Sequence, residues 1–321
     1  MQQNKKLDTA AFGGEGWCPR TRSHAMEIGD VWAGCGIDSE WKPLKAVLVH
    51  RPGPELMVSP DQVNALQLAA LPDLETARAE HDRMVALYEE NQVEVKRVVP
   101  GQAFLPNQLY CADLLAMTPQ GAILARPAST VRAGEERWVA KTLGMLGVPV
   151  LKTLTGTATF EGADLMWLDP VTAVIGRGLR TNQAAIDQIT SLLAEMGIIT
   201  LAFDLPFGTM HFMGMLRIVD RDLALIWPYR TPYGLVTALK DRGFRVKPLP
   251  SEVEAVSGMA FNFVVLGPGK IMLPAGNPQT LAAFEAMGIH CIPVTVDELQ
   301  KANGAMGCMT GILQREMEKS T

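Results

Sequence analysis

Four apolar segments of the chain carry side chains that could take part in chemistry. Asp113 follows FLPNQLYCA, and Glu161 and Asp164 share TATFEGADLMWL. His211 lies in PFGTMHFMGML, and Cys308 stands in the glycine-rich ANGAMGCMTGIL. An unpaired carboxylate is costly to bury, so the acidic residues indicate a cationic partner, either an arginine of the chain or a cationic ligand.

Together these residue types suit nucleophilic catalysis. A thiolate would attack an electron-poor carbon, a histidine would move protons, and carboxylates would hold a planar cation. We expect a helix to follow Cys308, so that its N-terminus and Thr310 lower the pKa of the thiol. Each residue also has a structural alternative. The cysteine or histidine could belong to the core, and the acids could pair with Arg126, Arg132, Arg177 or Arg180.

The elements that must position these residues repeat along the chain. Apolar runs of strand length, each stopped by Pro or Gly, occupy 44–52, 121–127, 172–178, 223–229 and 270–276. A helical segment is expected after each run, over 60–91, 134–147, 182–197, 232–243 and 278–288. Two short strands follow each helix. The unit is therefore strand–helix–strand–strand, five times over.

Five such units can close into a ring, which removes the exposed ends of an open array. An ordinary open α/β sheet is the alternative, but it does not require a repeat of about fifty residues. We therefore predict an α/β fold of five pseudo-symmetric blades. Because loops at the strand ends of such a ring converge on its axis, the reactive side chains would meet in one pocket.

Composition excludes several classes of function. The 321 residues include 29 basic and 34 acidic side chains, a net charge of −5, which predicts no nucleic-acid or membrane partner. No apolar stretch is long enough to span a membrane, and a secretory signal is not evident. Five cysteines without a CxxC pair argue against disulfides or a zinc site. We expect a cytoplasmic globular protein with a small-molecule partner, and a homo-oligomer is left open.

The first forty residues differ from the rest of the chain. They are rich in glycine and show no periodicity, and they include Trp17 and Trp32. We expect residues 1–40 to form an irregular arm that packs on the domain or on a neighbouring molecule. Residues 41–321 are then expected to form a single catalytic domain.

Six ordered motifs resemble the guanidino-group-modifying superfamily. Its members have the pentein fold and include arginine deiminases, dimethylarginine dimethylaminohydrolases and amidinotransferases. The likeness begins at about residue 40. It rests on LKAVLVHRPGPEL (44–56), PNQLYCAD (106–113), FEGAD (160–164), GRGLRTN (176–182), MHFMGML (210–216) and GCMTGILQR (307–315).

The resemblance implies a mechanism that needs no metal or organic cofactor. Cys308 would be the nucleophile, His211 the general acid and then the base, and Glu161 the carboxylate that orients the site. Addition of the thiolate to the guanidinium carbon would release an amine or ammonia and leave a covalent thiouronium. Water would then release a ureido product. An amidinotransferase, in which an amine replaces that water, is the alternative.

The resemblance also implies a set of substrate contacts. Asp113 would bind the guanidinium, and Arg132 and Arg180 match positions that hold a substrate carboxylate. Asp164 and Asn107 complete the expected contacts. The substrate would be arginine-like, with or without a substituent on the guanidine.

One departure bears on specificity. Arginine deiminases and amidinotransferases usually have an acidic residue two positions after the catalytic histidine, where this chain has Met213. We expect the methionine to weaken binding of an unsubstituted guanidinium and to leave apolar space for an N-substituent. A binding protein of the same fold, without catalysis, is a further alternative. The presence of Cys308, His211 and Glu161 argues against it.

Overall fold

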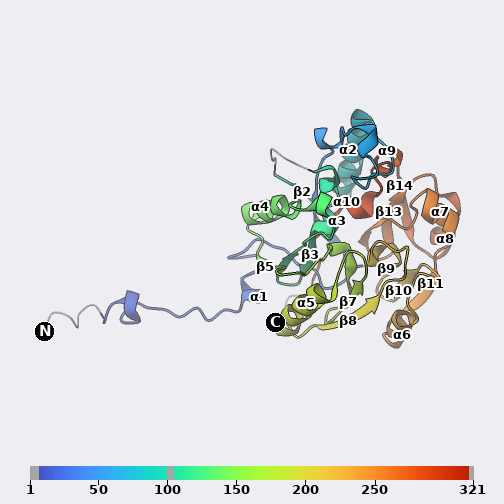
Figure 1. The fold of residues 1–321 in the computed structure, drawn as a ribbon. Helices are drawn as coiled ribbons and strands as arrows, with labels where there is room; N and C mark the ends of the chain where they lie inside the picture. The colour runs from blue at the N-terminus through green and yellow to red at the C-terminus, as the bar shows by residue number, and fades with distance from the viewer. Residues whose placement is uncertain (1–6, 100–104, 318–321) are drawn as a thin grey trace.

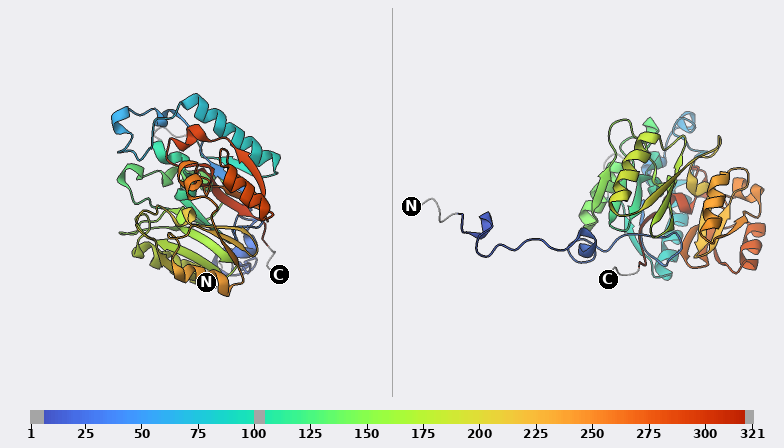
Figure 2. Two further views of the ribbon diagram at one scale, coloured as in Figure 1. Left: turned by 90° about the vertical axis from the view of Figure 1, so that its right-hand side faces the viewer. Right: turned by 90° about the horizontal axis from the view of Figure 1, so that it is seen from below.

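Five three-stranded sheets make up the body of the molecule. The computed structural model describes residues 7–99 and 105–317. In every sheet the middle strand pairs antiparallel with an inner strand and parallel with an outer strand (Figures 1 and 2). The inner strands are β3 (Leu115–Thr118), β6 (Leu165–Asp169), β9 (Leu216–Asp220), β12 (Val264–Gly267) and β15 (Gly311–Arg315).

Each middle strand leads through a helix to the outer strand of the same sheet, as a parallel pair requires. The middle strands are β1 (Leu44–Val49), β4 (Gly121–Leu124), β7 (Thr172–Arg177), β10 (Leu223–Ile226) and β13 (Lys270–Pro274). The outer strands are β2 (Glu94–Arg97), β5 (Val150–Thr153), β8 (Ile199–Asp204), β11 (Arg245–Pro248) and β14 (His290–Val294). The connecting helices are α2 (Leu74–Glu90), α4 (Glu136–Leu146), α5 (Gln183–Glu195), α6 (Tyr233–Asp241) and α8 (Pro278–Ala286). The predicted five-bladed α/β fold is confirmed.

The helix expected over 60–91 is shorter than predicted. It begins at Leu74, because Pro72 precedes it and the side chain of Asp73 accepts the N–H of Thr76 at 2.9 Å as an N-cap. Within the expected range 60–91, the residues before Pro72 form a loop, apart from a short turn over Pro60–Gln62. That loop reaches the candidate site, as described below.

The expectation of a helix after Cys308 is wrong. The residues that follow form strand β15, which pairs antiparallel with β1 and so completes the first blade with a strand from the other end of the chain. The ring closes by this pairing. It removes the free edges that β1 and β15 would otherwise expose, and this explains why a strand forms here.

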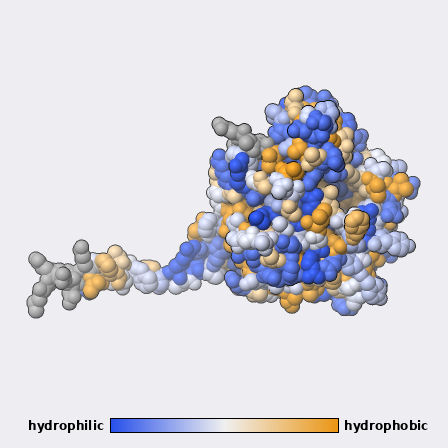
Figure 3. All heavy atoms as spheres, in the orientation of Figure 1, coloured by the Kyte–Doolittle hydropathy of each residue, from blue (hydrophilic) through white to orange (hydrophobic). Residues whose placement is uncertain are grey.

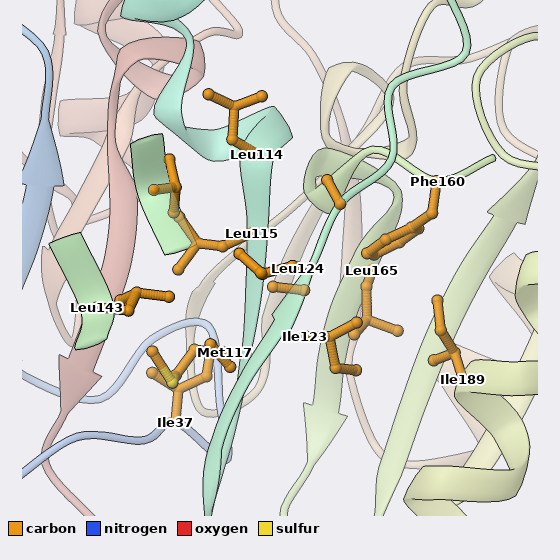
Figure 4. Packing of buried hydrophobic residues seen from close by; sticks show 14 of the residues in the cluster. Ile37, Leu114, Leu115, Met117, Ile123, Leu124, Leu143, Phe160, Leu165 and Ile189 are labelled. Carbon is orange, nitrogen blue, oxygen red and sulfur yellow. The ribbon is translucent and has the colours of Figure 1, made fainter. Parts of the chain in front are cut away.

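The apolar core lies between the blades and their covering helices. One cluster joins the second and third blades, and Figure 4 shows Leu115, Ile123 and Leu165 from their strands together with residues of the covering helices. Leu143 of α4 and Ile189 of α5 close its outer side and are fully buried. The inner and middle strands are thus fixed on both faces, which holds the loops at their ends in place.

The arm has an outer and an inner part. Residues 7–23 lead away from the blades, with exposed Phe12 and Trp17 (Figures 1 and 3). The inner part contacts the body. The N–H of Ala33 donates to Gly147, and Gly36 donates to and accepts from β15. In the described part of the chain, no helix has the length and apolar character needed to cross a membrane.

Candidate active site

The loops that precede the five inner strands converge on one site. Asp113 lies in the short helix α3 (Cys111–Leu114) before β3, and Glu161 precedes a turn before β6. His211 precedes a turn before β9, and Cys308 lies in α10 (Met306–Met309) before β15. Asn262 occupies the equivalent place before β12. Each blade therefore contributes one polar or reactive residue.

Six of the eight predicted site residues line a single pocket of about 330 Å³, a volume that includes solvent at its mouth. Glu161 lies behind the pocket wall and contacts it through His211. Asp164 does not line the pocket. The six that do are Asn107, Asp113, Arg132, Arg180, His211 and Cys308.

Glu161 and His211 form a buried ion pair. Nε2 of His211 lies 2.6 Å from a carboxylate oxygen of Glu161. Burial alone would lower the pKa of His211, but Asp113 and Glu161 outweigh it and raise the pKa to about 9. Burial would likewise raise the pKa of Glu161, but His211 and two arginines lower it to about 2. The imidazole is therefore protonated at neutral pH, with Nδ1 as the nitrogen available to the pocket.

Asp113 keeps one carboxylate oxygen free. Oδ2 accepts a hydrogen bond from Arg132 at 2.7 Å, whereas the buried Oδ1 has no hydrogen-bond partner among the described residues. Oδ1 lies 3.8 Å from Nδ1 of His211. Because a buried carboxylate oxygen needs a donor, this position is suited to receive an N–H from a bound cation.

Arg132 has its donors engaged by the protein itself. They reach Asp113, Glu161, Glu135 and the carbonyl of Asn107. Burial raises the pKa of Glu135 to about 8 in spite of this contact. The geometry makes Arg132 a residue that positions Asp113, and its predicted contact with a substrate carboxylate stays a prediction.

Arg180 is better placed to meet a substrate. One amino group donates to Glu161 at 3.1 Å, and the other lies 3.4 Å from the side-chain oxygen of Gln67. Its Nε is buried and has no partner among the described residues. Arg180 can therefore offer a donor to an anionic group at the pocket without breaking its ion pair.

The thiol of Cys308 is held by Asn262. The amide nitrogen Nδ2 donates to Sγ at 2.8 Å, and Oδ1 accepts the backbone N–H of Cys308 at 3.1 Å. Burial, with Asp113 adding to it, raises the pKa of the thiol to about 11. The expectation that a following helix would lower this pKa fails because β15 follows instead. In the unliganded pocket the thiol is therefore protonated at neutral pH.

Asp164 supports the histidine loop and does not face a substrate. It is fully buried, accepts the hydroxyl of Thr181 at 2.6 Å, and accepts the backbone N–H of Phe212 at 2.9 Å. Burial raises its pKa to about 6. Since Phe212 directly follows His211, the bond fixes the loop that carries the histidine. The predicted substrate contact of Asp164 is corrected to this positioning role.

Met213 also lies elsewhere than expected. It lines cavities among the inner strands, whereas Met210 lines the pocket beside His211 and Cys308. The inference that Met213 shapes the space around a guanidinium is therefore wrong. The turn over Phe212–Gly214 carries Met213 away from the pocket, and the apolar wall comes from the residue on the other side of the histidine.

Several pocket residues escaped the sequence analysis. Gln67 comes from the loop that was expected to be helical, and Asn303 donates to its carbonyl at 3.3 Å. Asn262 had a signal, since it is the polar residue before the fifth inner strand. No sequence signal marked the other three, because their positions depend on loops outside the repeat. These are Gln67, Asn303 and Met210.

Asp113, Glu161 and His211 offer ligand atoms that lie within 4.8 Å of one another, a spacing that could hold a metal ion. Their surroundings oppose this use. Glu161 already accepts from Arg132 and Arg180, so a bound metal ion would lie beside two guanidinium groups. An organic cation can instead donate an N–H to Oδ1 of Asp113 without taking Glu161 from its arginines.

Comparison with known proteins identifies the family of the chain. A family model described as N,N dimethylarginine dimethylhydrolase, eukaryotic, matches residues 62–314. The dimethylarginine dimethylaminohydrolase of Pseudomonas aeruginosa is 22% identical over 239 residues, which cover 74% of this chain and 89% of that protein. The uncharacterized protein YkgA of Bacillus subtilis is 24% identical over 275 residues, covering 85% and 92%.

Solved structures share the fold. A mutant of the Pseudomonas aeruginosa enzyme complexed with citrulline superposes with a TM-score of 0.70 at 22% identity and covers 84% of this chain and 98% of its own. The amidinotransferase SxtG of Microseira wollei gives 0.75 at 14% identity, covering 89% and 99%. The family match extends over most of the chain. The chain therefore belongs to the dimethylarginine dimethylaminohydrolase family of the pentein superfamily, and it is a hydrolase that acts on carbon–nitrogen bonds of guanidino compounds.

Proposed function

We propose that the protein hydrolyses an N-methylated, arginine-like guanidine through a covalent thiouronium on Cys308. The observation that carries this proposal is the buried Oδ1 of Asp113, which accepts no hydrogen bond from the described residues and lies in the pocket that also contains Cys308 and His211. A guanidinium bound there would satisfy the oxygen and neutralise the charge that helps to keep the thiol protonated. The product would be a ureido compound and a free methylated amine.

The first half of the reaction forms the covalent bond. Binding of the cation lowers the pKa of the Cys308 thiol, which loses its proton to solvent. Sulfur adds to the guanidinium carbon and gives a neutral tetrahedral adduct. His211 transfers the proton on Nδ1 to the departing amine as the carbon–nitrogen bond breaks. A cationic thiouronium and a neutral imidazole remain.

The second half releases the product. Neutral His211 takes a proton from water, and the oxygen adds to the thiouronium carbon. The carbon–sulfur bond then breaks, the thiolate leaves, and the carbonyl of the ureido product forms as its O–H proton passes to solvent. Glu161 stabilises the imidazolium at each stage through its contact with Nε2.

The remainder of the pocket supports an amino-acid substrate. Arg180 offers its unpartnered Nε to a carboxylate, and Gln67, Asn107 and Asn303 add neutral polar groups. The thioether of Met210 supplies apolar surface next to the reacting atoms, where N-methyl groups could lie. We further propose that residues 41–321 act as one catalytic domain in the cytoplasm and that residues 1–40 are an arm outside it.

A panel of guanidino compounds in ¹⁸O-labelled water tests this function. We expect asymmetric dimethylarginine and monomethylarginine to give a ureido product that carries ¹⁸O, together with the free methylated amine. Arginine and guanidino acids without an α-amino group should react more slowly. An amidinotransferase would instead transfer the amidino group to an added amine, without incorporation of label. That result, or no turnover of any compound, would contradict the proposal.

Asp113→Asn should separate substrate binding from thiol reactivity. We expect kcat/KM for the guanidine to fall roughly 10- to 150-fold, since a charge-assisted contact is lost. Removal of the negative charge should also lower the pKa of Cys308 from its value of about 11. Alkylation by iodoacetamide at pH 8 should then accelerate by about tenfold for each unit of the decrease.

The exposed Asp204→Asn is the control, because Asp204 pairs with Arg177 on the surface. It should alter neither rate. Equal alkylation of Asp113→Asn and wild type across the pH range would show that Asp113 does not act on the thiol. Loss of turnover would then need another explanation.

A further inference from the structure

A second hollow lies among the inner strands, on the other side of α10 from the active-site pocket. Cys308 lines the pocket, whereas its neighbours Gly307 and Thr310 line this axial cavity. The cavity also contains side chains from β6, β9, β12 and β15. Its free volume of about 50 Å³ has room for a few water molecules or one monatomic ion.

Two buried arginines face this cavity. Arg217 of β9 is 7% exposed and Arg315 of β15 is 3% exposed. Among the described residues, no carboxylate oxygen lies within 4.0 Å of either guanidinium. Arg217 stacks on the ring of Phe263 at 4.6 Å, and Arg315 donates to the carbonyl of Lys42 at 2.7 Å. The buried Nε of Arg315 finds no hydrogen-bond partner in the part of the chain that the structure describes.

Glu40 is the acidic group that lines the cavity with them. Its carboxylate accepts the backbone N–H of Trp167 at 2.9 Å and makes no close ion pair with either arginine. Burial lowers the pKa of Arg217 and of Arg315 to about 10, and both stay charged at neutral pH. Burial raises the pKa of the Glu40 carboxyl, and the two arginines oppose this rise. Among the described residues that line the cavity, two guanidiniums and one carboxylate leave at least one positive charge without a close counterion. A buried charge in this position calls for a partner.

We propose that the axial cavity binds one halide-sized monovalent anion between Arg217 and Arg315. The excess positive charge favours an anion, and a compact monovalent ion fits among the side chains that line the cavity. The two arginines supply N–H donors, and the apolar side chains of Met166, Met213 and Val265 limit the remaining space. Because the cavity and the active-site pocket share no lining residue, the proposal does not depend on the reaction.

Thermal unfolding of the full chain in sodium bromide, compared with sodium gluconate at equal ionic strength, tests the site. We expect bromide to raise the midpoint saturably, by on the order of 2–4 °C, because an ion that binds only the folded state stabilises it. Gluconate has the same charge but is much larger than a halide, and it should not act in this way. Identical curves in the two salts would overturn the proposal.

Two variants of residues that line the cavity locate the effect. Arg217→Met should abolish the difference between bromide and gluconate. Glu40→Gln keeps the acceptor for Trp167 but removes the competing charge, so it should lower the half-saturating bromide concentration by at least about fivefold. This second variant decides the question if the first does not fold. A wild-type response in either variant would place the ion elsewhere and refute the site.

The exposed Arg245→Met is the control, because Arg245 pairs with Asp222 on the surface and is remote from the cavity in the fold. It should keep the full bromide response. A crystal grown in bromide adds a direct measurement. We expect an anomalous peak between the two guanidiniums, and its absence at saturating bromide would equally refute the site.

Discussion

Cys308→Ala is expected to lower kcat for a methylated arginine by at least about 10⁴-fold, because a covalent route cannot proceed without its nucleophile. The side chain is small and partly buried, so the fold should survive the change. Turnover and the thermal unfolding midpoint should be measured on the same preparation. In the wild type, acid quench during turnover followed by mass spectrometry should find the thiouronium on the peptide that contains residue 308.

Cys291→Ala is a matched control for this experiment. Burial raises the pKa of the Cys291 thiol to about 11, the value given for Cys308, but Cys291 lies on β14 away from the pocket. It should retain full activity. Retained turnover in Cys308→Ala, or an adduct on another cysteine, would end the covalent mechanism proposed here.

His211→Asn is expected to lower kcat by about 10²–10⁴-fold, the usual contribution of a general acid and base. The two halves of the reaction should respond differently to an S-alkylisothiourea substrate. Its thiol leaves without a proton from His211, so the adduct on Cys308 should still form. Water can no longer be activated, so the adduct should accumulate, and intact-protein mass spectrometry can follow it.

His290→Asn, an exposed change on β14, controls for loss of an imidazole in general and should react as the wild type does. If the isothiourea adduct of His211→Asn were released as fast as that of the wild type, another group would have to activate the water. If the adduct did not form at all, His211 would be needed for attack by sulfur and not only for proton transfer to the leaving amine.

Much of the fold could be predicted because the same pattern occurs five times. Each apolar run, helix and first short strand in the sequence forms the middle strand, helix and outer strand of one blade, and the second short strand is the inner strand of the next blade. Errors at single boundaries such as Leu74 do not change this architecture. The closing strand β15 escaped prediction. Its pairing partner β1 lies more than 250 residues earlier, so no local pattern indicates it.

The candidate site was predictable where a residue must be polar and buried. Asp113, Glu161 and His211 stand out in apolar segments, and the fold brings them together. The roles of individual residues within the site were harder to predict from the sequence. Asp164 and Glu161 are three residues apart, and only the path of the turn between them decides that one faces His211 and the other the backbone of Phe212. Met210 and Met213 are also three residues apart, and the path of the turn between them decides that only Met210 lines the pocket.

Closure of the ring by β15 has a consequence for synthesis of the protein. Ribosomes make the blades in order, but the first blade lacks its inner strand until the chain has been made through Arg315. Residue 308, the proposed nucleophile, is also made only shortly before that point. Products of translation interrupted before Arg315 would therefore lack both the closed first blade and, when the interruption comes before residue 308, the proposed nucleophile.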